Sequence, residues 1–128
     1  MIRILVVEDN KDLNAILVKR LQYEGYIVDS LSDGYALLTY LRDGVEPDAV
    51  ILDLMLPGRS GIELLNTIIT VWKSAKIFIF SAHSEYEKRH TLKGFNIAGY
   101  ICKTDGSDKL ISLIKIEFKG SDSPPGTG

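Results

Sequence analysis

Short apolar runs alternate along this chain with longer segments in which apolar residues recur at helical spacing. The run at residues 49–52, Ala-Val-Ile-Leu, is uninterrupted, as is typical of a strand with both faces covered. Apolar residues spaced for one buried helix face follow the first strand at Leu13, Ile16, Leu17 and Leu21. Strands that are separated by helices usually pair in parallel through right-handed crossovers, so the alternation predicts a three-layer α/β/α domain.

The pattern predicts five strands and five helices. Gly25 follows the first helix at the position of a C-terminal cap, and Asp29 and Ser30 interrupt the second strand, which favours an edge position for it. The order of the strands cannot be derived from the pattern alone. We expect strands at 2–7, 26–31, 49–53, 76–81 and 98–103, and helices at 9–24, from 32 or 33 to 42, at 62–72, 85–95 and 107–118.

Length and composition favour one globular domain. The 128 residues can bury one sizeable core, and we assign it to residues 1–119. Residues 120–128 are rich in Gly, Ser and Pro, which predicts a disordered tail or a linker remnant.

Charge and cysteine content exclude several classes of protein. A net charge of -2 gives no basic footprint for nucleic acid. The single cysteine, Cys102, excludes an internal disulfide, fits a reducing compartment, and is expected to be a small core residue. No apolar stretch approaches the ~20 residues of a membrane span, and no signal-type leader precedes the first strand. We therefore expect a soluble cytoplasmic protein.

Polar side chains follow four of the predicted strands. They are Glu8 with Asp9, then Asp53, Ser81 and Lys103. Because the carboxyl ends of parallel strands lie at one edge of a sheet, where α/β folds bind ligands, these groups can converge.

Three converging carboxylates need compensation. Each pair at 4 Å costs roughly 4 kcal/mol at an effective dielectric constant near 20. A raised pKa or a bound cation relieves this repulsion, and oxygen ligands favour Mg²⁺. Such a cation, a hydroxyl and a lysine can neutralise a phosphoryl group, and one carboxylate can act as nucleophile and form an acyl phosphate.

Four motifs in this order resemble the receiver domain of two-component response regulators. They are Leu-Val-Val-Glu-Asp at 5–9, Ile-Leu-Asp-Leu-Met-Leu-Pro-Gly at 51–58, Phe-Ser-Ala at 80–82 and Tyr-Ile-Cys-Lys at 100–103. The resemblance extends from residue 3 to about residue 118. It implies a flavodoxin-like doubly wound parallel sheet of five strands in the order 2-1-3-4-5.

The resemblance also implies a role for each matching residue. Asp53 matches the phosphoryl-accepting aspartate, Glu8 and Asp9 match the acidic pair that holds Mg²⁺ together with Asp53, and Met55 matches the position whose backbone carbonyl also reaches the metal. Lys103 matches the lysine that pairs with the phosphoryl group.

Two further matches imply a conformational switch. Ser81 matches the hydroxyl that moves to bond the phosphoryl group, and Tyr100 matches the aromatic side chain that then turns inward. Met55 and His83 match positions that flank the path of a hydrolytic water, and His83 can donate or accept a proton near neutral pH.

Simpler interpretations of the same residues stay open at this point. Glu8 and Asp9 can cap the first helix, where acids favour the helix dipole. Ser81 alone can be a helix cap, Lys103 an exposed loop residue, and Tyr100 a half-buried strand residue. His83 can be an exposed loop residue.

Two features depart from the family pattern. Thr104 follows Lys103 where proline is common, so we expect either a trans bond with a shifted loop or a cis bond costing about 2.5–4 kcal/mol. This stretch resembles receivers attached to LuxR-type DNA-binding domains, whereas 54–58 resembles the OmpR branch, and the subfamily stays open. Ile116 points away from the apolar face of the last helix, as an isolated exposed residue or as part of a partner surface.

The leading hypothesis is a phosphorylation-controlled switch that turns over no substrate beyond its own phosphorylation and dephosphorylation. A sensor histidine kinase or phosphotransfer protein is the implied donor. The implied output is transcriptional, through a DNA-binding effector domain absent from this chain and through the face formed by the fourth helix, last strand and last helix. A homodimer through that face stays open.

Two other classes can be compared on the same residues. A haloacid-dehalogenase-like phosphatase also places an aspartate after an apolar strand, but its second acid would fall at Met55. An FMN-binding flavodoxin would need a hydroxyl-rich phosphate loop where this chain has the acidic segment 8–12.

Overall fold

A computed structural model describes residues 1–82 and 94–119 and contains one five-stranded parallel sheet with the order β2-β1-β3-β4-β5. This confirms the expected fold class and the strand order implied by the resemblance. The strands are β1 (Arg3–Val7), β2 (Ile27–Leu31), β3 (Ala49–Leu52), β4 (Lys76–Ser81) and β5 (Gly99–Cys102).

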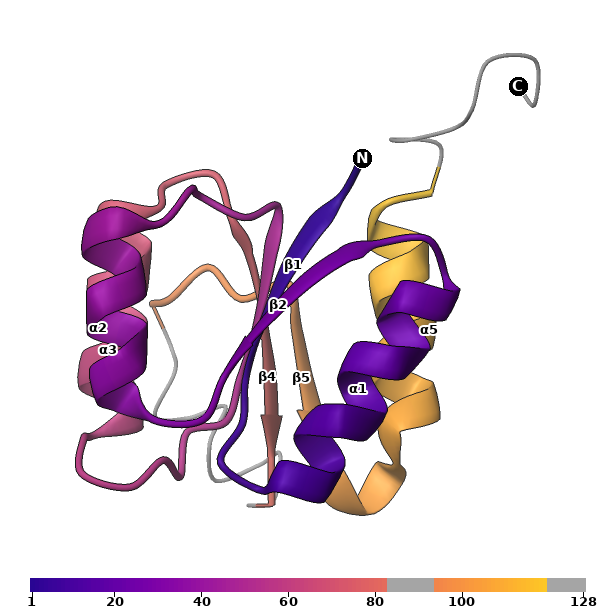
Figure 1. The fold of residues 1–128 in the computed structure, drawn as a ribbon, viewed down its shortest axis with the longest axis horizontal. Helices are drawn as coiled ribbons and strands as arrows, with labels where there is room; N and C mark the ends of the chain where they lie inside the picture. The colour runs from indigo at the N-terminus through magenta and orange to yellow at the C-terminus, as the bar shows by residue number, and fades with distance from the viewer. Residues whose placement is uncertain (83–93, 120–128) are drawn as a thin grey trace.

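Helices cover both faces of this sheet (Figure 1). One face carries α1 (Lys11–Tyr23) and α5 (Ser107–Glu117), and the other carries α2 (Gly34–Asp43) and α3 (Gly61–Val71). The helix expected at 85–95 falls almost entirely on residues 83–93, which lie outside the described residues. Its last two positions, 94 and 95, form a turn and a bend.

The central strands have the uniform apolar sequence that their position requires. Every residue of β3 is buried, because both of its neighbours in the sheet and the helices on both faces exclude water. The apolar side chains divide into two clusters, one between the sheet and α2 with α3, the other between the sheet and α1 with α5. As predicted, β2 is an edge strand, and its burial is only partial.

The first helix begins later than the sequence suggests. Asn10 is its N-cap, with Oδ1 accepting a hydrogen bond from the Leu13 N–H at 3.0 Å. Glu8 and Asp9 therefore precede the cap, so the simpler interpretation of these acids as helix caps is wrong. The end of the helix is as predicted, because Gly25 has φ 95°, a left-handed conformation that favours glycine.

The predicted apolar face of α1 was partly wrong. Leu17 and Leu21 are fully buried, but Ile16 is 48% exposed. Successive residues turn by about 100° around a helix, so Ile16 points well to one side of Leu17 and away from the sheet. On α5 the prediction is confirmed, since Leu110, Ile111 and Ile114 are buried and Ile116 is 70% exposed.

The segment after β5 forms a short 3-10 turn, Lys103–Asp105. No peptide bond in the described ranges is cis, so the Lys103–Thr104 bond adopts the trans alternative. Cys102 is half-buried rather than a core residue, because it ends the edge strand β5, and its Sγ accepts a hydrogen bond from Thr104 Oγ1 at 3.1 Å. Among the residues described, no helix is both long and apolar enough to cross a bilayer.

Candidate functional site

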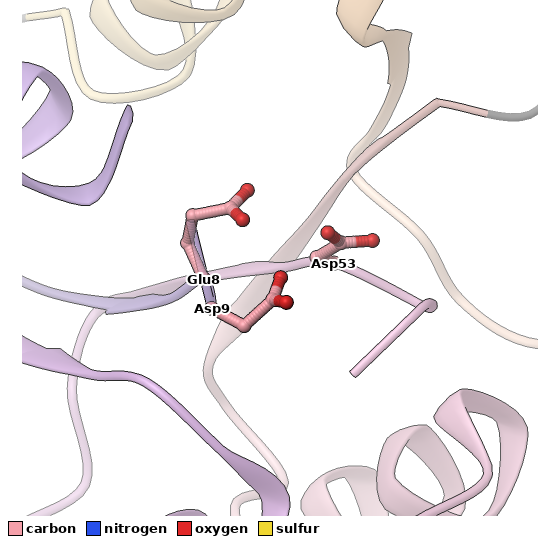
Figure 2. Close-up of side chains that lie close together, drawn as sticks. All are labelled: Glu8, Asp9 and Asp53. Carbon is pink, nitrogen blue, oxygen red and sulfur yellow. The ribbon is translucent and has the colours of Figure 1, made fainter. Parts of the chain in front are cut away.

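Three carboxylates meet at the carboxyl edge of the sheet. Glu8 and Asp9 follow β1, and Asp53 follows β3, the neighbouring strand. The backbone continues this pairing one residue further, because the Asp53 N–H donates to the Val7 carbonyl oxygen at 3.2 Å. One carboxylate oxygen from each of the three acids lies within 4.8 Å of the others. Figure 2 shows the three side chains close together.

Burial divides these acids into two kinds. Glu8 is 1% exposed and Asp53 is 3% exposed, whereas Asp9 is open to solvent. Each buried carboxylate accepts a backbone hydrogen bond within its own turn: Glu8 Oε2 from the Asn10 N–H and Asp53 Oδ1 from the Met55 N–H, both at 2.9 Å. These bonds hold both side chains in one orientation at the end of their strands.

Lys103 joins the two buried acids. Its Nζ lies 2.6 Å from Asp53 Oδ2 and 2.7 Å from Glu8 Oε1. The lysine follows β5, two strands away from β3, so only the folded sheet brings it to this position. The expected convergence of the two acidic strand ends with Lys103 is therefore present in the structure.

The ionisation of this cluster follows from burial and pairing. Burial raises the pKa of the Glu8 carboxyl above its usual value, and the contacts from Lys103 and the Asn10 N–H only partly oppose this rise. Burial disfavours the charged form of Lys103, but its hydrogen bonds to Asp53 and Glu8 outweigh that effect, and the pKa of Lys103 is raised. Lys103 therefore stays a cation across the neutral range.

The donor set suits a hard cation. Three carboxylates from two adjacent strand ends supply only oxygen ligands, which is the chemistry that Mg²⁺ prefers. Lys103 contacts one oxygen of each buried acid, and the exposed Asp9 carboxylate faces the same space. Residues Glu8, Asp9 and Asp53 can therefore hold such an ion.

The other predicted site residues have different positions relative to this cluster. Ser81 ends β4 and is fully buried, and its Oγ has no hydrogen-bond partner within the described part of the chain. Tyr100 is half-buried on β5, opposite Ile79 of β4. Met55 is 53% exposed in the loop after Asp53. His83 lies outside the described residues.

The loop after Asp53 is anchored by a contact that sequence reasoning missed. The Arg59 guanidinium lies 5.4 Å from the centre of the Tyr35 ring, a cation–π contact between this loop and the start of α2. Gly58 in the same loop has φ 80°, and a Cβ there would come within 2.9 Å of the Tyr35 ring. The signal for this contact was weak, because the two residues are 24 positions apart and no local pattern relates them.

The comparisons with known proteins agree over most of the chain. The family model described as the response regulator receiver domain matches residues 4–115. The transcriptional regulatory protein DltR of Streptococcus agalactiae is 34% identical over 122 residues, which are 93% of this chain and 53% of DltR. The chain thus spans about half the length of the curated relatives it matches.

Solved structures agree with this result. The response regulator TrrA of Thermotoga maritima, crystallised in complex with Mg(2+)-BeF, is 36% identical with a TM-score of 0.78, covering 91% of this chain and 98% of its own. The non-phosphorylated HemR receiver domain of Leptospira biflexa has a TM-score of 0.84 at 24% identity, covers 98% of both chains, and is similar in fold.

Proposed function

This chain belongs to the response regulator receiver domain family, and on that premise we propose that Asp53 accepts a phosphoryl group within a Mg²⁺ site formed by Glu8, Asp9 and Asp53. The observation that carries the proposal is the position of the Asp53 carboxylate. It is almost fully buried at the end of β3, oriented by the Met55 N–H, and paired with Lys103 at 2.6 Å.

The chain's own groups provide the chemistry of transfer. A carboxylate oxygen of Asp53 attacks the phosphorus of a phosphohistidine, the P–N bond breaks, and the leaving imidazole takes up a proton. Lys103 can pair with the negatively charged phosphoryl oxygens on Asp53, because its Nζ already contacts the Asp53 carboxylate. Mg²⁺, held by Glu8, Asp9, Asp53 and the backbone carbonyl of Met55, would supply positive charge for the phosphoryl oxygens.

A switch would follow through Ser81 and Tyr100. A buried hydroxyl without a described partner is costly, and a new phosphoryl oxygen could accept its hydrogen bond. Tyr100 lies on the strand that pairs with β4, two residues before the partner of Ser81, so a shift at Ser81 would be passed to it along this strand pair. The output face would then include the helix expected at 85–95, β5 and α5, and Met55 and His83 would set the rate of hydrolysis.

The donor would be a sensor histidine kinase or a phosphotransfer protein. A surface groove of about 610 Å³ beside Glu8, bordered by α1 and the end of β2 and including Lys11 and Lys19, offers a surface on which it could dock. We expect the exchange in the cytoplasm, since a single cysteine fits a reducing compartment.

The chain is a signalling domain, and we propose that it turns over no substrate beyond its own phosphoryl group. Its output would be transcriptional, through an effector domain that binds DNA, because its relative DltR is a transcriptional regulatory protein. The family match leaves the haloacid dehalogenase alternative without support, and Met55 occupies the place of that family's second acid. A homodimer through the helix expected at 85–95, β5 and α5 is consistent with the exposed Ile116.

The test is intact-mass spectrometry after incubation with acetyl phosphate, with Mg²⁺ or with EDTA. We expect a single phosphoryl adduct that requires Mg²⁺, is absent in Asp53→Asn and is unchanged in Asp43→Asn, a matched substitution of an exposed aspartate at the end of α2. An adduct that persists in Asp53→Asn, or that forms equally in EDTA, would contradict the proposal.

A further inference from the structure

One side chain of α1 holds the turn that carries the acidic pair. Asn14 is half-buried, and its Nδ2 donates hydrogen bonds to two backbone carbonyl oxygens, of Glu8 at 3.0 Å and of Leu31 at 3.2 Å. These carbonyls belong to the ends of two adjacent strands, β1 and β2. A single amide group therefore links α1 to both strand ends.

The two carbonyls belong to a connected network of hydrogen bonds around this turn. Leu31 O also accepts the Glu8 N–H at 3.0 Å, so it receives both a strand bond and the Asn14 bond. The Asn14 N–H donates to the Asn10 carbonyl at 2.9 Å, and the Asn10 N–H donates to Glu8 Oε2 at 2.9 Å. The segment from Glu8 to Asn10 is thus fixed by bonds within its own turn and, from outside, by the Glu8 N–H bond to β2 and by the Asn14 amide.

The bond from the Asn14 amide to the Glu8 carbonyl affects where the carboxylates of Glu8 and Asp9 lie. The Glu8 N–H bond to Leu31 fixes the peptide group before Glu8, whereas the bond from α1 to the Glu8 carbonyl fixes the peptide group between Glu8 and Asp9. That peptide group determines where both side chains leave the backbone. Leucine has the same number of side-chain heavy atoms as asparagine, branched at the same carbon, but no donor, so it would leave the Glu8 carbonyl without this bond.

We propose that Asn14 is a positioning residue for the cation site, acting on Glu8 and Asp9 through their backbone and not by contact with the ion. The inference rests on the proposed function for its ligand, Mg²⁺. Polar groups that orient ligands from outside the coordination sphere commonly change metal affinity by about 10–100-fold. Asn14 acts through a backbone carbonyl, so we expect the lower end of that range.

The experiment is isothermal titration calorimetry with MgCl₂ on wild type, Asn14→Leu and Asn66→Leu. Asn66 is exposed on α3, on the opposite face of the sheet from α1 (Figure 1), so the control makes the same chemical change away from the site. Each protein is titrated well below its own melting temperature, where circular dichroism shows it folded. We expect about tenfold weaker Mg²⁺ binding for Asn14→Leu and wild-type binding for Asn66→Leu.

The outcomes separate this inference from the proposed function. Equal affinity of folded Asn14→Leu and wild type, or an equal loss in Asn66→Leu, would overturn the positioning role while the metal site stands. An absence of Mg²⁺ binding in the wild type would overturn both. If Asn14→Leu does not fold, Asn14→Ser, whose shorter hydroxyl cannot bond both carbonyls, must show the same weakening, and wild-type affinity in that variant would refute the inference.

Discussion

Replacing Lys103 with methionine tests how the buried acids are held. The substitution keeps a long side chain but removes the cation that lies 2.6 Å from Asp53 Oδ2 and 2.7 Å from Glu8 Oε1. Two carboxylates with almost no exposure would then share one cluster without a counter-charge. We expect a folded but clearly destabilised protein.

The size of the loss follows from these contacts. At an effective dielectric constant of about 20, each contact is worth roughly 6 kcal/mol of attraction, most of which desolvation offsets. Removing one partner of a buried ion pair typically costs about 3–5 kcal/mol. The side chain of Lys103 is 22% exposed, so we take the lower end, about 3 kcal/mol, which a domain stable by about 5–15 kcal/mol survives.

The loss should depend on pH. Burial raises the pKa of Glu8 above its usual value of 4.5, and without the opposing contacts of Lys103 it rises further. A carboxyl with a raised folded-state pKa contributes stability that is present below the unfolded-state pKa and is lost as pH rises through the folded-state pKa. The deficit of Lys103→Met should therefore be small near pH 4.5 and grow toward neutral pH.

Urea denaturation of wild type and Lys103→Met across this pH range measures the deficit directly. Lys109→Met is the matched control, because Lys109 forms an exposed pair with Asp105 at 3.6 Å. This substitution should lower the free energy of unfolding by less than about 1 kcal/mol. Mg²⁺ should stabilise Lys103→Met, because a bound cation replaces the missing charge. A deficit that is the same at every pH, or no larger than that of the control, would refute the reasoning.

Two further predictions concern the scaffold. Gly61→Ala should cost about 1–3 kcal/mol of unfolding free energy in urea denaturation, because its Cβ would collide with the Leu54 backbone. Gly34→Ala, also at the first position of a helix, should cost less, because its Cβ would lie 3.0 Å from the nearest side-chain atoms, those of Arg59, and meet no backbone. Tyr40 donates to Asp29 Oδ2 at 2.7 Å, and burial and this bond raise the pKa of Tyr40 to about 12. Wild type should therefore exceed Tyr40→Phe in free energy of unfolding by about 1 kcal/mol below pH 10, and this difference should disappear toward pH 12 in denaturation experiments. A difference that persists at pH 12 would contradict the assignment.

Local pattern was a good guide to the elements. The pattern located all five strands to within one residue at each end. The reason is plainest for the central strands, where burial on both faces leaves little choice of side chain. Helix starts were less accurate: Asn10 caps α1 in place of the acids before it, since an amide and a carboxylate are both good caps and only the chain geometry selects one. The exposure of Ile16 was missed because spacing alone does not fix where the edge of a buried face lies.

The sequence by itself determined the alternating α/β organisation and the polar residue at the end of each central strand. Periodicity and burial can be inferred from residues that are close together in the sequence. Tertiary structure alone decided which of these groups meet. Lys103 and Asp53 are 50 positions apart, and they pair only because crossovers place β5 two strands from β3. The bonds of Asn14 to two strand ends, and the contact of Arg59 with Tyr35, likewise depend on how helices dock on the sheet, which no local pattern encodes.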